Sequence, residues 1–129
     1  MTLKQLEKID LEVAKRLGWT HLHKGSTNYK EKNLKFLNKK SWVGIAPGNI
    51  RNQFVPHYSI NLVYAWDCID WAIDHLFRFK MLSLEGAQTE FEMSFSNQDG
   101  RLRGQGYGTT PQIAICRAFL DLNNEIKEV

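Results

Sequence analysis

The N-terminal hydrophobic pattern predicts an amphipathic helix over residues 2–17. Apolar residues recur at three- and four-residue steps from Leu3 to Leu17, with Ile9 or Asp10 at the third step. This is the period of one helix face. Thr2 is a natural N-cap, and Gly18 ends the helix because glycine readily adopts the left-handed conformation of a C-cap. We expect Trp19 to pack back onto the core.

The strongest helical pattern covers residues 59–77, with Ser59 as its expected N-cap. A wide apolar stripe is expected to face the core. Its members are Leu62, Val63, Trp66, Ile69, Ile73, Leu76 and Phe77. Asp67, Asp70 and Asp74 recur on the other side, which is typical of a solvated helix face. Nothing near them completes a metal site.

The C-terminal half predicts an antiparallel meander followed by a helix. Strand patterns cover 78–85, 89–96 and 101–107, and Asp99–Gly100 is a hairpin turn signal. The last helix begins near Pro111, capped by Thr109 or Thr110. Residues 41–46 form a further short strand, and residues 47–56 a loop. The fold class is therefore α+β, a single-domain sandwich of an antiparallel three- to four-stranded sheet with three helices.

The chain of 129 residues is the size of one domain, so we assign residues 1–129 to it. Residues 20–40 are expected to form a lysine-rich loop insertion. The chain contains no run of 18 apolar residues, so we expect no transmembrane helix. The charged N-terminus does not resemble a signal peptide. The two cysteines, Cys68 and Cys116, lie in helical patterns and are interpreted as buried thiols in a reducing cytoplasm.

Charge is distributed unevenly along the chain. Residues 18–58 hold seven basic residues and one acidic residue, a net charge of +6, whereas residues 59–99 hold two basic and seven acidic residues, a net charge of −5. The basic segment indicates an anionic partner or a solvated lysine loop. Lysine without arginine is the weaker signal for a specific phosphate site.

Three glycines precede the last helix, at positions 104, 106 and 108. A dinucleotide fingerprint needs a parallel strand before the glycines and another strand after the helix, and this context is absent. Glycines on one strand face instead favour close approach of a helix. The N-terminus of the helix, with Arg101 and Arg103 beside it, still offers groups that bind phosphate. Arg117 is either a ligand of that anion or a structural arginine paired with Glu90 or Glu92.

Three motifs together resemble the phage ABA sandwich domain family of small phage and prophage proteins. They are Leu17-Gly18-Trp19, the helix start with Tyr58, Ser59, Ala65 and Trp66, and the segment from Thr109 to Ala118. The resemblance covers most of the chain except residues 20–40. It implies an α/β sandwich with helices packed on an antiparallel sheet, and a phage context more than an activity.

The phage context suggests a function by analogy with the nucleotide sponges that counter Thoeris and CBASS defence. We expect a protein that binds and sequesters an anionic nucleotide signal, a cyclic oligonucleotide or a cyclic ADP-ribose-like molecule, without cleaving it. We expect no enzymatic activity, no cofactor and no metal. We expect the protein to form a homo-oligomer. The candidate ligand-binding residues are Trp42, Arg51, Phe54, Arg101, Arg103, Tyr107, Thr109, Thr110 and Arg117. Alternatives are inhibition of a host protein by direct contact, and nucleic-acid binding through residues 20–58.

Overall fold

The computed structural model describes residues 1–25, 41–86 and 90–126. Its helices are α1 (Leu3–Leu17), α2 (Leu62–Asp74) and α3 (Pro111–Ile126). One antiparallel sheet contains β1 (Thr20–Gly25), β2 (Ser41–Ile45) and β3 (Asn52–Phe54). The other contains β4 (Arg78–Leu84), β5 (Glu90–Ser96) and β6 (Leu102–Gly108). The predicted α+β class with three helices and an antiparallel sheet is confirmed.

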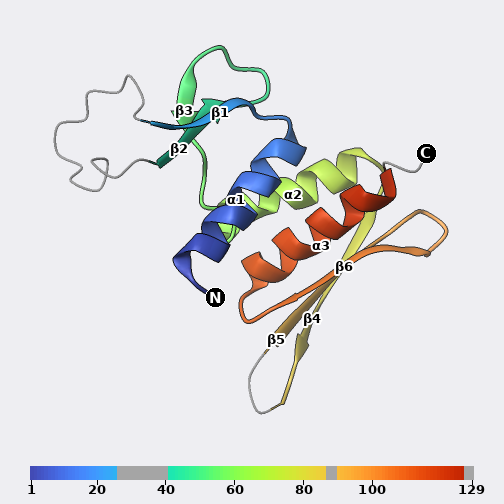
Figure 1. The fold of residues 1–129 in the computed structure, drawn as a ribbon. Helices are drawn as coiled ribbons and strands as arrows, with labels where there is room; N and C mark the ends of the chain where they lie inside the picture. Colours follow the sequence, from blue (N-terminus) through green and yellow to red (C-terminus); the bar gives the residue numbers. More distant parts are fainter. Residues whose placement is uncertain (26–40, 87–89, 127–129) are drawn as a thin grey trace.

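The small sheet β1–β2–β3 was not expected from the sequence. Thr20–Gly25 forms a strand where a loop was predicted, and Asn52–Phe54 forms another inside the predicted loop 47–56. The rest of the expected insertion, residues 26–40, lies outside the described residues. The small sheet lies beside α1, whereas the larger sheet lies beyond α2 and α3 (Figure 1).

Helix α1 matches its prediction closely. The Thr2 hydroxyl accepts a hydrogen bond from the Gln5 amide, and the Gln5 side chain accepts one from the Thr2 amide, which makes a capping box. Gly18 ends the helix with a φ of 104°, a left-handed conformation that glycine tolerates best. Trp19 is buried, and its indole N–H donates to the Tyr58 hydroxyl at 3.1 Å.

Helix α3 lies directly on the larger sheet because one face of β6 carries no side chains. A Cβ added to Gly106 would lie 2.3 Å from the amide nitrogen of Ala118, and one added to Gly104 would lie 2.7 Å from the Ala118 carbonyl oxygen. Gly104, Gly106 and Gly108 thus admit the helix backbone to contact distance. The prediction that the three glycines allow a helix to approach the strand closely is confirmed.

The core is formed where the helices meet the inner face of the larger sheet. Met93 and Phe95 of β5 are fully buried, and they pack with Phe119 of α3. The outer face of the same sheet is more polar, since Lys80, Glu92 and Ser94 lie there beside one another. None of the helices in the described part of the chain has the length and apolar composition needed to cross a membrane.

Helix α2 departs from its prediction in both its start and its buried face. Asn61, not Ser59, caps the helix by accepting a hydrogen bond from the Val63 amide at 3.0 Å. The buried residues are Ala65, Cys68, Ile69 and Ala72. Apart from Ile69 and the half-buried Phe77, the predicted stripe is exposed. Mostly small residues of α2 are buried, and Trp71 packs edge-to-face on Phe119 of α3 at a centroid distance of 5.3 Å, while Leu62, Val63, Trp66, Ile73 and Leu76 are exposed.

The glycine stripe generates a stability prediction. Gly106→Ala should lower the free energy of unfolding by about 3 kcal/mol, because the new methyl group would meet helix backbone that cannot rotate away. Gly25→Ala is the matched control, since its nearest neighbour is the His23 side chain at 3.3 Å and its cost should stay below about 1 kcal/mol. Urea unfolding measures both, and equal costs would contradict the backbone contact.

The two thiols should be unreactive in the folded protein. Cys68 of α2 and Cys116 of α3 are both free and fully buried. Burial raises the pKa of the Cys68 thiol, and the neighbouring Cys116 raises it further. Ellman's reagent at pH 8 should therefore label both cysteines only after urea unfolding. The variant Ile50→Cys, at a position that is 91% exposed, should react at once. Rapid labelling of the native wild type would disprove the burial.

Candidate functional site

A groove of about 540 Å³ lies between α1, the small sheet and the segment leading into α2. Its walls are mostly apolar, and three aromatic side chains line it, namely Trp42, Phe54 and Tyr64. The lining residues from α1 are Leu3, Leu6, Glu7, Asp10 and Leu11. Concave apolar surfaces with a few polar groups are the usual form of small-molecule sites.

The strands β2 and β3 bring Trp42 and Phe54 to this groove. Val43 lies opposite Phe54 in the antiparallel register, and the Val55 amide donates to the Trp42 carbonyl at 3.0 Å. Trp42 packs against the core, so its position is set by the fold. The Lys24 ammonium lies 5.8 Å from the centre of the Trp42 ring and 3.4 Å from the Glu7 carboxylate. One edge of the groove therefore holds a cation over an aromatic face.

Asp10 is the buried polar group of the groove. It is 5% exposed, and its Oδ1 accepts a hydrogen bond from the Ser59 amide at 2.7 Å. Its Oδ2 lies 3.3 Å from His57 Nδ1. The Ser59 hydroxyl in turn donates to the Leu6 carbonyl at 3.3 Å. These bonds fasten α1 to the segment before α2, and they explain why Ser59 is buried and does not cap the helix.

His57 extends from Asp10 toward solvent. Its side chain is 73% exposed, and only its Nδ1 is bonded within the described residues. A carboxylate on Nδ1 holds the proton there and leaves Nε2 free to accept a hydrogen bond from a ligand. When the ring is protonated, the same nitrogen donates to an anion instead. His57 thus supplies an adaptable polar group at the edge of an apolar groove.

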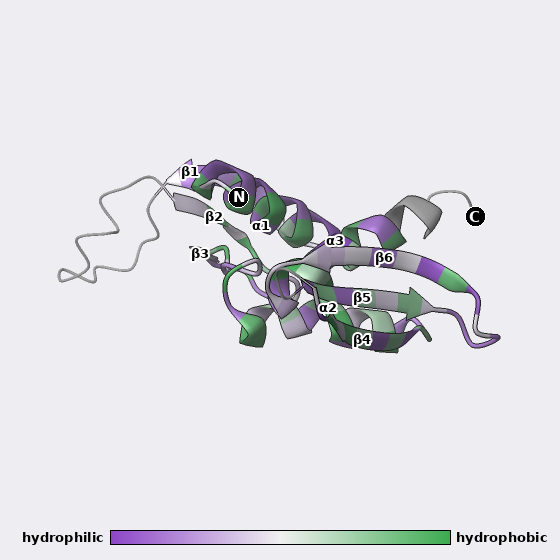
Figure 2. Ribbon diagram, turned by 90° about the horizontal axis from the view of Figure 1, so that it is seen from below, coloured by the Kyte–Doolittle hydropathy of each residue, from purple (hydrophilic) through white to green (hydrophobic). Residues whose placement is uncertain are grey.

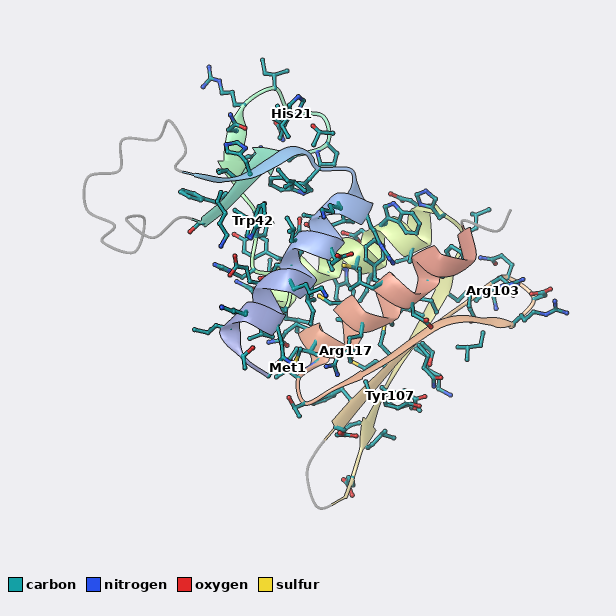
Figure 3. The ribbon with its side chains drawn as sticks, viewed as in Figure 1. Met1, His21, Trp42, Arg103, Tyr107 and Arg117 are labelled. Atoms are coloured by element: carbon teal, nitrogen blue, oxygen red, sulfur yellow. The ribbon has the colours of Figure 1, made fainter. Side chains whose placement is uncertain are left out.

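Of the nine predicted ligand-binding residues, only Trp42 and Phe54 line this groove. Arg51 is exposed in the segment before β3. The remaining six residues belong to β6, the hairpin before it and the start of α3. Figure 3 shows Trp42 on the small sheet, well away from Arg103, Tyr107 and Arg117. The fold therefore divides the predicted set between two regions.

The β6–α3 residues have largely structural contacts. Arg117 Nη1 donates to the Tyr107 carbonyl at 2.7 Å, so the arginine bonds the backbone of β6 and its bonded partner here is neither Glu90 nor Glu92. The Thr110 hydroxyl accepts from the Ile113 amide at 3.3 Å and so caps α3, with Thr109 exposed beside it. The Tyr107 hydroxyl donates to Glu92 at 3.3 Å.

The electrostatics of this second region do not favour an anion at Tyr107. Partial desolvation and the Glu92 carboxylate raise the pKa of the Tyr107 hydroxyl. The Gln105 side chain also donates to Glu92. Arg101 is exposed on the hairpin, where its backbone amide donates to Asn97 at 2.8 Å, and Arg103 is half-buried. A carboxylate therefore lies beside the aromatic ring that was expected to stack on a nucleotide base.

Three groove residues, Asp10, His57 and Tyr64, were not among the predicted ligand-binding residues. One signal was present, because a charged residue at position 10 stands in the apolar stripe of the first helix. A carboxylate on a buried helix face requires a hydrogen-bonding partner from another segment. The identity of that partner, Ser59, depends on contacts between residues 49 positions apart.

Truncating the buried carboxylate should destabilise the protein. Asp10→Ala leaves the Ser59 amide without its acceptor, and should lower the free energy of unfolding by about 2–3 kcal/mol. Asp10→Asn keeps one acceptor oxygen and should cost less. His57→Ala should cost less than about 1 kcal/mol because the ring is largely exposed. Urea unfolding at pH 7 ranks the three variants. A His57→Ala cost equal to that of Asp10→Ala would assign the stability to the ion pair.

Comparisons with known proteins identify no relative from which the groove could be interpreted. No family model, curated protein or solved structure matches the chain. The resemblance to the phage ABA sandwich domain family accordingly stays a prediction from the sequence motifs.

Proposed function

We propose that this protein is a non-enzymatic, phage-type anti-defence protein that sequesters an anionic nucleotide signal in the cytoplasm of a bacterial host cell, as a homo-oligomer. The groove lined by Trp42, Phe54 and Tyr64 is the observation that carries the proposal. Its volume suits a nucleoside, and its aromatic rings can stack on a base regardless of base identity. The ligand is held intact and released unchanged.

The groove offers separate environments for the two ends of a nucleotide. The base is expected between the aromatic side chains, where water is excluded. The charged part is expected at the outer edge, near His57 and Lys24. The Glu7 carboxylate already pairs with Lys24, and Asp10 is already bonded to Ser59 and His57. The Lys24 ammonium offsets the charge of Glu7, which reduces the repulsion between this acid and an anionic ligand.

The first experiment is native mass spectrometry of the protein with a panel of cyclic oligonucleotides and ADP-ribose derivatives. A stoichiometric adduct of unchanged ligand mass supports sequestration. Recovery of a cleaved ligand would overturn the non-enzymatic part of the proposal. Absence of any adduct across the panel would overturn nucleotide binding and favour direct inhibition of a host protein.

Ile60 allows the charge of the ligand to be tested at one position. This groove residue is 50% exposed, so replacing it disturbs the core little. Ile60→Glu should weaken binding of an anionic nucleotide at least tenfold relative to Ile60→Lys, a difference of about 1.4 kcal/mol. Isothermal titration calorimetry measures both. Equal affinities would show that the ligand's charge lies elsewhere.

Aromatic truncation locates the base. Phe54→Ala should lower affinity about tenfold or more, because stacking on one base contributes about 1–3 kcal/mol. Arg101→Ala is the control at the other candidate region and should leave affinity unchanged. If Arg101→Ala abolishes binding and Phe54→Ala does not, the site lies beside β6 and the groove assignment is wrong.

A further inference from the structure

Helix α2 and strand β4 carry a contiguous exposed apolar surface. Trp66 is 44% exposed, and its ring packs edge-to-face on Phe79 of β4, with ring centroids 5.9 Å apart. Phe79 is itself 42% exposed, and Leu62 and Ile73, on the same side of α2 as Trp66, are 42% and 48% exposed. Contiguous exposed apolar surfaces of this kind mark interaction sites. We name these four residues the α2–β4 strip.

The two edges of the larger sheet differ in how side chains from the rest of the chain bond their backbone groups. At the β6 edge, the Gln105 amide donates to the Asp121 carboxylate at 3.0 Å, and the Tyr107 carbonyl accepts from Arg117. Both side chains come from α3, which lies along this edge strand. Two of the backbone groups of β6 that face away from β5, the Gln105 amide and the Tyr107 carbonyl, are therefore bonded within the chain.

The β4 edge has no such cover among the described residues. Backbone groups in a strand alternate in direction, and Gln105 and Tyr107 point away from β5. Following the register across the sheet, the amides and carbonyls of Phe79, Met81 and Ser83 point outward from β4. Within the described ranges, no side chain makes a hydrogen bond to these backbone groups. The edge is straight, without proline or bulge, and Figure 2 shows β4 at the outer side of the sheet.

The charges beside this edge suit a second copy of the chain in antiparallel orientation. Arg78 and Lys80 lie at the start of β4 and share the outer face of the sheet. Glu90 and Glu92 lie on the same face of β5, beside Leu84 and Leu82 at the end of β4. Full overlap of two antiparallel β4 strands pairs residue 78 with 84 and residue 80 with 82. Each basic residue then lies in one row with an acidic residue of the other copy, two strands and about 10 Å away, with a leucine between them.

We propose that two copies of this protein dimerise through β4, joining their three-stranded sheets into one continuous six-stranded sheet. The pairing is isologous, with Met81 on the two-fold axis and Phe79 opposite Ser83 of the other copy. Each of these pairs exchanges two backbone hydrogen bonds. The α2–β4 strips of both copies lie on the same face of the joined sheet and cover each other. This dimer does not depend on the nucleotide groove, which α1 and the small sheet form on another part of the chain.

A proline at the edge separates backbone pairing from side-chain contact. Ser83→Pro removes an outward N–H while leaving the β4–β5 bonds in place, because position 83 does not bond to β5. Ser83→Ala keeps the N–H and is the matched control. Light scattering after size exclusion, over a dilution series, should show a wild-type dimer, an unchanged Ser83→Ala dimer and at least a thirtyfold higher dimer dissociation constant for Ser83→Pro. A monomeric wild type, or a Ser83→Pro dimer as stable as the Ser83→Ala dimer, would overturn the proposal.

A charge exchange tests the orientation of the pairing independently. At low ionic strength, the variants Arg78→Glu and Glu90→Lys should each dissociate more readily than the wild type, because the pairing places like charges of the two copies about 10 Å apart in one row. An equimolar mixture of the two should form the heterodimer in preference to either homodimer, as both rows then hold opposite charges. Native mass spectrometry distinguishes the three species. A statistical mixture would contradict the antiparallel register. Circular dichroism spectra matching the wild type confirm that each variant is folded.

Discussion

The close contact between α3 and β6 is the constraint on which the rest of the structure depends. Three glycines leave one face of β6 without side chains, so the backbone of α3 reaches contact distance with the strand. Phe119 of α3 then packs with Phe95 and Met93 at the centre of the core. Arg117 and Asp121, on the same helix, reach the outer edge of β6. The packing of α3 on β6 thus also bonds two backbone groups at the β6 edge of the sheet.

The position of α3 also determines how α2 is buried. Helix α2 meets α3 through Ala65, Cys68 and Ala72, and small side chains allow a short distance between the helices. Ile69 is buried and Trp71 packs edge-to-face on Phe119 of α3, whereas Leu62, Trp66 and Ile73 lie exposed. The same composition that predicts a buried stripe therefore produces an exposed strip, and this strip is what a second copy of the chain would cover.

The groove has a different origin, in the attachment of the small sheet to α1. Buried Asp10 bonds the segment at His57 and Ser59 to the first helix, and β2 and β3 place Trp42 and Phe54 on the opposite wall. Trp42 and Phe54, two of the nine predicted ligand-binding residues, lie on this wall because aromatic residues in short strands tend to be held against a core. The arginines were predicted by chemical type alone. Residue type does not determine which side chains lie close together, and the fold places Arg103 and Trp42 on different sheets (Figure 3).

Features that depend on neighbours along the chain could be predicted from the residues alone. The capped helix of Leu3–Leu17, the meander of three strands and the start of α3 at Pro111 follow from periodicity, turn residues and capping, which act over a few residues. The tertiary structure decided what depends on distant contacts. The partner of Asp10, the face of α2 that is buried and the pairing of Thr20–Gly25 with Ser41–Ile45 all join segments that the chain separates. Periodicity identifies an apolar face, but only packing decides whether another element is there to cover it.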